Sequence, residues 1–152
     1  MACVAGDGTR ARLTWSATCR TGAEVPPSER LQSIFRAVGE AVRTHRPEAV
    51  ALERLMWGKN IGSAMEVARA CGAVMVAAAE AGIPVEEYAP LEVKMAVTGS
   101  GNASKEQVRK GLTFLLGPEA VPGGPDAADA VAVAVCHLRQ SRMRQLAREV
   151  AT

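Results

Sequence analysis

The chain has 152 residues, the size of one domain that can bury a core of its own. Apolar residues make up 48% of it but aromatic residues only 3%, so Ala, Val and Leu must do most of the packing. The net charge of +2 favours polyanionic partners only mildly, and no uninterrupted apolar run reaches the roughly 18 residues of a membrane span, which argues against a membrane protein.

The first twenty residues predict a β-hairpin. Short β-compatible segments at residues 2–5 and 12–16 flank the turn signal Gly6-Asp7-Gly8. Asp7 is most simply a turn residue, because aspartate tolerates a left-handed backbone. A loop then leads to a helix that Ser28 is expected to cap. Its apolar side chains recur at helical spacing, at Leu31, Ile34, Phe35, Val38 and Val42.

Residues 48–53 predict a buried strand that ends at Glu53. An acid at the end of a buried strand is costly unless it is paired, protonated or bound to a metal. The irregular stretch that follows contains Met56, Trp57, Lys59 and Asn60. An indole beside a lysine and an asparagine on a loop suits contact with nucleic-acid bases, while packing of Trp57 beneath the loop is an equally open alternative.

The middle of the chain predicts three helices and a strand. Residues 64–82 form a helix rich in Ala and Gly, and such small residues favour a packed central helix and a subunit interface. A strand at 83–88 precedes a short helix that starts at Pro90 and carries Lys94. The Gly-containing loop at 98–102 could offer backbone amides to a phosphate, although most such loops are turns. Ser104 is expected to cap the helix 105–116, which begins with Lys105.

The last helix opens with Pro125, Asp126 and Asp129. Proline suits the first helical turn, and acids there complement the positive end of the helix dipole. Because the two aspartates are three residues apart, they share one helix face and can aim at the same point. A buried helix whose acids only complement the dipole is the alternative. Together with Glu53, the two aspartates outline a carboxylate site for magnesium. The helix is expected to run past His137 and to fray in its Arg-rich end, residues 139–148.

The predicted order is β-β-α-β-α-β-α-α-α, which indicates a single α/β domain with a mixed sheet and helices on its faces. The basic residues gather in three groups, which suit either phosphate binding or a solvated face. These groups are Arg10, Arg12 and Arg20; Lys94, Lys105, Arg109 and Lys110; and Arg139, Arg142, Arg144 and Arg148.

The four cysteines are widely spaced and form no CxxC pair. Since the sequence shows no signal peptide, they are interpreted as reduced, mostly buried residues of a cytoplasmic protein. This spacing argues against a zinc site. The four are Cys3, Cys19, Cys71 and Cys136.

Several short segments, in order along the chain, carry a resemblance to a known family. They are Ser28-Glu29-Arg30-Leu31, Ala51-Leu52-Glu53, Lys59-Asn60-x-x-Ser63-Ala64, Ala70-x-Gly72, Glu87-Tyr88-Ala89-Pro90-x-x-Val93-Lys94, Val97-Thr98-Gly99-Ser100-Gly101, Lys105-x-Gln107-Val108 and Asp126-Ala127-Ala128-Asp129-Ala130-x-Ala132-x-Ala134-x-x-His137. Each is modest alone, but the ordered set resembles the RuvC family of Holliday-junction resolvases, in the RNase H-like superfamily.

The resemblance implies an RNase H-like three-layer fold, a mixed sheet flanked by helices on both faces. It implies a homodimeric endonuclease that nicks two opposed strands of a four-way DNA junction during recombination and repair. It also implies Mg²⁺ or Mn²⁺ as the cofactor, with two ions in each active site. The partners that it implies are junction DNA and the branch-migration helicase complex of RuvA and RuvB.

The resemblance also assigns roles to particular residues. Glu53 matches the second catalytic acid of the family, and Asp126 and Asp129 match the acids of its last helix, so all three would bind metal. Lys94 and Lys105 match lysines near the scissile phosphate. The loop after the strand-end glutamate supplies DNA contacts, from Met56, Trp57, Lys59 and Asn60. In the family an aromatic there probes bases; here Met56 occupies that position, with Trp57 next to it.

The chain departs from the family at its start. The family opens with a strand that ends in Asp-Pro-Gly and supplies the first metal-binding aspartate, whereas this sequence matches from the second strand onward. Asp7 imitates that motif, but too few residues separate it from Thr21 for the rest of the family's hairpin. We therefore expect the chain by itself to lack the first strand and to be inactive. The alternatives are a catalytically incomplete junction-binding dimer and another RNase H-like nuclease, such as a transposase core.

Overall fold

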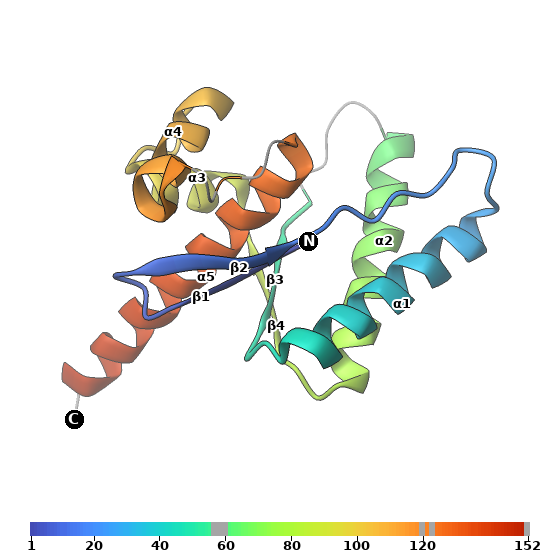
Figure 1. Cartoon of the computed structure of the whole chain (residues 1–152), viewed down its shortest axis with the longest axis horizontal. Coiled ribbons are helices and arrows are strands. Elements are labelled where there is room, and N and C mark those ends of the chain that lie inside the picture. The colour runs from blue at the N-terminus through green and yellow to red at the C-terminus, as the bar shows by residue number, and fades with distance from the viewer. Residues whose placement is uncertain (56–60, 119–120, 122–123, 151–152) are drawn as a thin grey trace. The chain divides into compact units, whose positions relative to one another are not determined.

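The computed structural model describes residues 1–55, 61–118, 121 and 124–150. Its elements follow the predicted order, and the contacts divide the chain into two compact units, Met1–Thr18 with Tyr88–Thr152 and Cys19–Glu87, which are described one at a time (Figure 1). The elements are β1 (Ala2–Gly6), β2 (Ala11–Ser16), α1 (Pro27–His45), β3 (Val50–Glu53), α2 (Ile61–Glu80), β4 (Val85–Tyr88), α3 (Pro90–Thr98), α4 (Lys105–Leu116) and α5 (Pro125–Val150).

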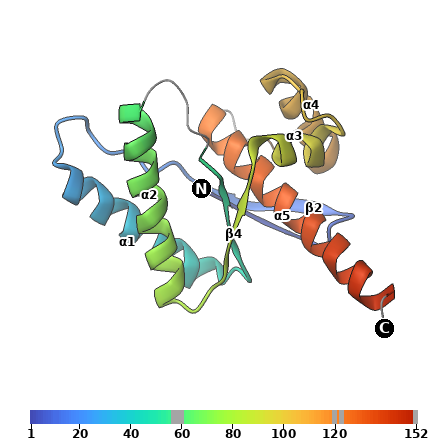
Figure 2. The same ribbon diagram turned by 180° about the vertical axis from the view of Figure 1, so that it is seen from behind.

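In the first unit, β1 and β2 form the predicted antiparallel hairpin, with Ala2 opposite Ser16 and Gly6 opposite Ala11. Both strands pack against α5 (Figures 1 and 2). Along β2, Arg12 and Thr14 are exposed while Ala11, Leu13 and Trp15 are half-buried, which is the alternation of a strand with one covered face.

The turn of the hairpin is held by Asp7. Its Oδ1 accepts hydrogen bonds from the backbone N–H of Thr9 at 2.9 Å, from the Thr9 hydroxyl at 2.6 Å and from the N–H of Arg10 at 3.0 Å. The N–H of Asp7 in turn donates to the carbonyl of Arg10. The bonds from Thr9 and Arg10 hold the pKa of Asp7 well below its ordinary range. The structure therefore confirms Asp7 as a turn residue.

The core of this unit surrounds α5. Small and medium apolar side chains fill it, as the composition requires, and α3 and α4 pack on the same helix (Figure 1). The most deeply buried side chains are Tyr88, Leu112, Val131, Val135 and Cys136. The helix itself continues beyond His137, as predicted, and the structure carries it through the Arg-rich end to Val150.

In the second unit, α1 and α2 pack against each other, and β3 pairs with β4. The two strands run in the same direction and α2 connects them (Figures 1 and 2). A backbone bond from the N–H of Val50 to the carbonyl of Pro84 joins their starts at 2.9 Å. The ion pair of Arg30 on α1 with Glu66 on α2, at 3.8 Å, adds to the helix contact.

Two local predictions in this unit are wrong. Ser28 does not cap α1, because the helix begins one residue earlier, at Pro27, with Pro26 in the cap position and no side-chain cap bond. Proline at the first helical position has its φ angle already set for a helix. The strand before Glu53 is half-buried rather than buried, and Glu53 is exposed. Among the described residues β3 has β4 as its neighbour in a sheet of two strands, which is too little to enclose it.

Helix α2 is long and apolar, yet most of its surface is not buried. From Gly62 to Glu80 its length and composition would allow it to cross a membrane, a test that core helices of soluble proteins also pass. Ala77 and Ala78 are buried, whereas Met65, Val67 and Val76 are exposed. The expectation of a packed central helix therefore holds for one face of α2, and a second apolar face is left open.

All four cysteines lie in the described residues and are free thiols. Cys136 is buried, Cys3 and Cys71 are half-buried, and Cys19 is exposed, so the expectation of mostly buried cysteines is wrong for Cys19. Cys19 lies in the irregular segment between β2 and α1, where no element covers it within the described residues. Burial raises the pKa of Cys136 to about 11, so its thiol is unreactive at neutral pH.

The turn at Asp7 predicts a pH dependence of stability. Because the pKa of Asp7 is lowered on folding, its carboxylate stabilises the hairpin above the ordinary aspartate pKa of about 4, and this stabilisation is lost as the pH falls below that value. We expect Asp7→Asn to lower the melting temperature near neutral pH and to differ less from the wild type as the pH approaches 2. Thermal melts followed by circular dichroism across this range test it; a difference that is constant with pH would contradict it.

Gly8 predicts a steric requirement in the same turn. Its φ is +86°, and a Cβ atom there would lie 2.6 Å from Cβ of Arg142 and 2.8 Å from the carbonyl oxygen of Leu138. We expect Gly8→Ala to lower the free energy of unfolding by about 2–4 kcal/mol, from backbone strain and overpacking together. Gly99→Ala is the control, because Gly99 has a similar φ of +77° with nothing within 4 Å. Equal losses in urea denaturation would contradict the packing argument.

Candidate active site

The two predicted aspartates of α5 both face solvent. The helix starts at Pro125, and the N–H of Ala128 bonds to the carbonyl of Gly124 at 3.1 Å. Ala127 and Ala128 are 7% and 9% exposed, and Val131 is fully buried. Since these apolar residues take the inner face of the helix, Asp126 and Asp129 are left exposed. The prediction of two carboxylates on one accessible face is confirmed.

Lys105 reaches one of these aspartates. Its Nζ lies 3.8 Å from Oδ2 of Asp129, and both side chains are exposed, at 86% and 55%. An ion pair so exposed stabilises the fold by less than about 1 kcal/mol, so stability does not explain it. Two of the residues predicted to act together, one on α4 and one on α5, therefore lie side by side.

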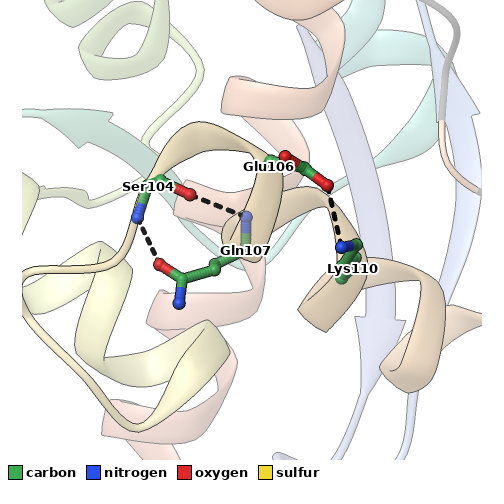
Figure 3. Close-up of polar contacts among 4 residues, drawn as sticks. All are labelled: Ser104, Glu106, Gln107 and Lys110. Atoms are coloured by element: carbon green, nitrogen blue, oxygen red, sulfur yellow. Dashed lines mark hydrogen bonds and ion pairs between the residues drawn. The ribbon is translucent and has the colours of Figure 1, made fainter.

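The start of α4 places Lys105 there. The Ser104 hydroxyl accepts a bond from the N–H of Gln107 at 3.2 Å, and Oε1 of Gln107 accepts one from the N–H of Ser104 at 2.8 Å (Figure 3). This reciprocal capping fixes the first residue of the helix. Lys110 pairs with Glu106 of the same helix at 2.8 Å (Figure 3), which raises the pKa of Lys110. Lys105 is thus the lysine of α4 that is directed to α5.

Lys94 lies on α3, which is tied to α5 by several polar contacts. Lys94 is half-buried between Val93 and Val97, both of which are buried. Arg139 of α5 donates to the carbonyl of Ala96. In the part of the chain that the structure describes, Lys94 makes no ion pair with Asp126 or Asp129 as Lys105 does. Its role near a phosphate stays a prediction.

Two further contacts of α5, one with α3 and one with the last residue of β4, were not found by sequence reasoning. Glu92 uses one carboxylate oxygen to accept the N–H of Ala89, at 2.7 Å, and the other to accept from Gln140, at 3.2 Å. His137 is held from both sides, with Nδ1 at 2.8 Å from the Tyr88 hydroxyl and Nε2 at 3.2 Å from the Ser141 hydroxyl. The sequence signal was the four-residue spacing of His137 and Ser141 on one helix face.

The loop after α3 is a tight turn, and it does not present a group of unbonded backbone N–H donors. The Thr98 hydroxyl accepts the N–H of Ser100 at 3.1 Å, the N–H of Ala103 donates to the Ser100 carbonyl, and the N–H of Gly99 donates to the Met95 carbonyl. These backbone donors are already used. The structure therefore favours the turn interpretation of residues 98–102 over a phosphate cradle.

Glu53 lies in the second unit, exposed at the end of β3. Next to it, Arg54 donates to the carbonyl of Glu87 at 3.4 Å, which links the ends of β3 and β4. The predicted DNA-contacting residues Met56, Trp57, Lys59 and Asn60 lie outside the described residues. Over the residues that are described, no three His, Cys, Asp or Glu side chains form a ready metal-binding group.

The donor chemistry at the start of α5 nevertheless fits a hard divalent cation. Asp126 and Asp129 offer carboxylate oxygens, which Mg²⁺ and Mn²⁺ prefer, and their exposure leaves room for water ligands. Mg²⁺ is commonly held by one or two carboxylates together with substrate phosphates. The adjacent Lys105 is a cation that can contact such a phosphate.

Comparison with known proteins agrees with this chemistry. Residues 1–137 match the family described as "Crossover junction endodeoxyribonuclease RuvC". The RuvC of Moorella thermoacetica is 46% identical over 132 residues, covering 87% of this chain and 79% of that protein. The RuvC of Pelotomaculum thermopropionicum is 44% identical over 130 residues, covering 86% and 79%.

Solved structures give the same result. The structure titled "T. thermophilus RuvC in complex with Holliday junction substrate" superposes with a TM-score of 0.88 at 39% identity, covering 93% of this chain and 87% of that one. A second Thermus thermophilus RuvC structure gives 0.84. The fold is thus the predicted RNase H-like α/β fold. On the motifs, the site and these similarities, the chain belongs to the RuvC family of crossover junction endodeoxyribonucleases.

Proposed function

We propose that this chain is the catalytic subunit of a structure-specific endonuclease that resolves four-way DNA junctions by symmetric, metal-dependent nicking. The observation that carries this proposal is the grouping of Asp126, Asp129 and Lys105 on accessible surface, within the residues that match the nuclease family. The relative whose structure holds a Holliday junction supports the substrate class. Action in homologous recombination and DNA repair follows from this substrate.

Asp126 and Asp129 are the residues of the first unit that would hold Mg²⁺ or Mn²⁺. When bound, such ions supply an activated water and stabilise the leaving oxygen of the phosphodiester. Glu53 is proposed as a further acid of the same reaction on the basis of its motif, Ala51-Leu52-Glu53. The number of ions and the preference between the two metals stay predictions.

Lys105 contributes a positive charge beside Asp129. The lysine would contact a non-bridging oxygen of the scissile phosphate and hold the phosphate close to the carboxylates. Its positive charge would offset the repulsion between the anionic phosphate and these carboxylates. Lys94 is proposed for the same phosphate from α3. The loop with Met56, Trp57, Lys59 and Asn60 is proposed to contact bases near the crossover.

One alternative is a protein that binds junctions without cutting them. It shares the lysines and the fold but not the turnover, so binding and cleavage must be measured separately. The other alternative, a transposase-like nuclease core, is excluded by the family to which the chain belongs. Partnership with RuvA and RuvB and a cytoplasmic location stay predictions.

Asp129→Asn tests the proposed site. Because the chain by itself is expected to be inactive, the variant is made in a chain that also carries the family's first strand with its Asp-Pro-Gly aspartate. There we expect it to abolish cutting of a labelled four-way junction in Mg²⁺ or Mn²⁺, by at least about a hundredfold, while junction affinity changes little, because affinity comes mainly from basic contacts with phosphate. Denaturing gels report cutting, and fluorescence anisotropy reports binding.

Asp7→Asn is the matched control for this experiment, since it removes one exposed aspartate from the same unit. Loss of cutting in Asp7→Asn alone would make Asp7 a metal ligand and overturn its assignment to the turn. Binding without any cutting by the chain that carries the family's first strand and no substitution would favour the binding-only alternative.

We further propose that the enzyme is a homodimer formed through α2. Met65, Ala68, Gly72, Val76 and Ala79 fall on one stripe of the helix at spacings of three and four residues. Met65 and Val76 are 48% and 54% exposed, and a Cβ atom at Gly72 would meet nothing within 4 Å. An exposed apolar seam with small residues at its centre suits close approach by the same helix of a second copy.

Val76→Glu tests the dimer. A charge within an apolar seam would be buried without a partner, so we expect monomers at concentrations of about 10–100 μM, where the unaltered chain is expected to be dimeric. Sedimentation velocity measures the change. Val67→Glu is the control, because Val67 is 47% exposed on a different face of α2. Equal dissociation of both variants would contradict the assigned face.

A further inference from the structure

Helix α4 carries a second cation on the same flank as Lys105. Arg109 follows Lys105 by four residues, so the two side chains lie about 40° apart around the helix and about one turn apart along it. Arg109 is exposed, and its guanidinium has no hydrogen bond or ion pair within the part of the chain that the structure describes. It lies just outside the motif Lys105-x-Gln107-Val108, so that motif gives it no role.

The packing of α4 on α3 fixes the direction of this flank. A Cβ atom at Gly111 would lie 2.9 Å from both Cγ1 and the carbonyl oxygen of Val97, so this side of α4 is pressed against α3. Arg109 precedes Gly111 by two residues, about 200° around the helix, and therefore points away from α3. Lys105, on the same flank, reaches Asp129 of α5. The flank of Lys105 and Arg109 is thus the side of α4 that borders the proposed catalytic aspartates.

The neighbouring cation of α4, Lys110, is engaged differently. Its Nζ lies 2.8 Å from Oε1 of Glu106 (Figure 3), and Lys110 is about 100° farther around the helix than Arg109. Glu106 is the acid of α4, and its charge is offset by Lys110. Of these two adjacent cations, Arg109 is the one that has no acid partner among the described residues. Its charge is available to an anion from outside the chain.

The step from Lys105 to Arg109 suits the step between neighbouring phosphates of DNA. Four residues of an α-helix rise about 6 Å. Phosphates of one strand are about 3.4 Å apart along the duplex axis, and farther apart along the backbone because it also winds around that axis. A strand that crosses α4 with its scissile phosphate at Lys105 can therefore place the next phosphate at Arg109. The flank continues with Leu112 and Leu116, so it offers two cations and then becomes apolar.

We propose that Arg109 binds the phosphate next to the scissile one, on the same DNA strand. The inference rests on the proposed function, which places the scissile phosphate at Lys105. The guanidinium fork can donate two parallel hydrogen bonds to phosphate oxygens. Two adjacent phosphates that are held at fixed points set the direction in which the strand passes the aspartates. Arg109 thus orients the substrate as well as adding affinity.

The first test is Arg109→Gln in the full chain, titrated with an immobile four-way junction in EDTA and followed by fluorescence anisotropy. Glutamine is a good helix former and suits an exposed helical position. We expect affinity to fall about three- to tenfold, and the slope of log affinity against log salt to become shallower by about 0.9, for one lost phosphate contact. Arg109→Lys should recover the slope, because it restores the charge.

Junctions with single neutral methylphosphonates identify the phosphate that each residue contacts. The phosphates near the crossover are replaced one position at a time, on both opposed strands. A replacement that weakens binding by the wild type should cost little more in a variant that has already lost the same contact. We expect Arg109→Gln to be insensitive at one position and Lys105→Gln at another, and these two positions to be adjacent on the strand.

Lys110→Gln is the matched control, because it removes the same charge from the next residue of the same helix. It should remain as sensitive as the wild type at every position. The inference is overturned if this control lowers affinity and slope as much as Arg109→Gln does. It is also overturned if Arg109→Gln becomes insensitive at no position, or at one that is not adjacent to the position of Lys105. Failure of the unaltered chain to bind any junction, or sensitivity of Lys105→Gln at every position, would contradict the proposed function and the inference with it.

Discussion

The packing of α5 determines where the chemistry of the first unit can occur. Val131, Val135 and Cys136 are completely or almost completely buried, and this buried face fixes the rotation of the helix about its axis. Asp126 and Asp129 are outside because the residues between them, Ala127 and Ala128, are inside. A shift of one residue in this register would turn a carboxylate into the apolar core, where an unpaired charge costs several kcal/mol. The same packing that stabilises the unit thus places its acids.

The buried face fixes the rotation of α5 but not the position of the helix along its own axis. Polar contacts with α3 and with the end of β4 restrain that position. Gln140 reaches Glu92 in the first turn of α3, and His137 reaches Tyr88 at the end of β4, so two side chains about one helical turn apart on α5 are held from outside the helix. Arg139 adds a bond to the carbonyl of Ala96 toward the other end of α3. Such hydrogen bonds are directional, and apolar packing is not. Movement of α5 along its axis would break several of them together.

Local signals in the sequence predicted the elements, because helices and strands follow from periodicity, caps and turn residues. The hairpin turn at Asp7, the start of α4 after Ser104 and the two outward aspartates were all predicted in this way. The burial of Glu53 was predicted wrongly, because burial depends on which elements cover a strand and not on the strand's own apolar residues. Arg139 was grouped with the phosphate-binding candidates for the same reason, since its bond to Ala96 depends on tertiary packing.

The distribution of charge along α5 shows why tertiary contacts are needed to argue function. Acids near the N-terminus of a helix and bases near its C-terminus are each favoured by about 0.3–1 kcal/mol through the helix dipole. Asp126 at one end and Arg144 at the other would therefore suit this helix even in a protein that binds no DNA. The dipole does not require a lysine from α4 beside Asp129. This contact brings a charged group from a different element to the start of α5, and it distinguishes a site from a well-capped helix.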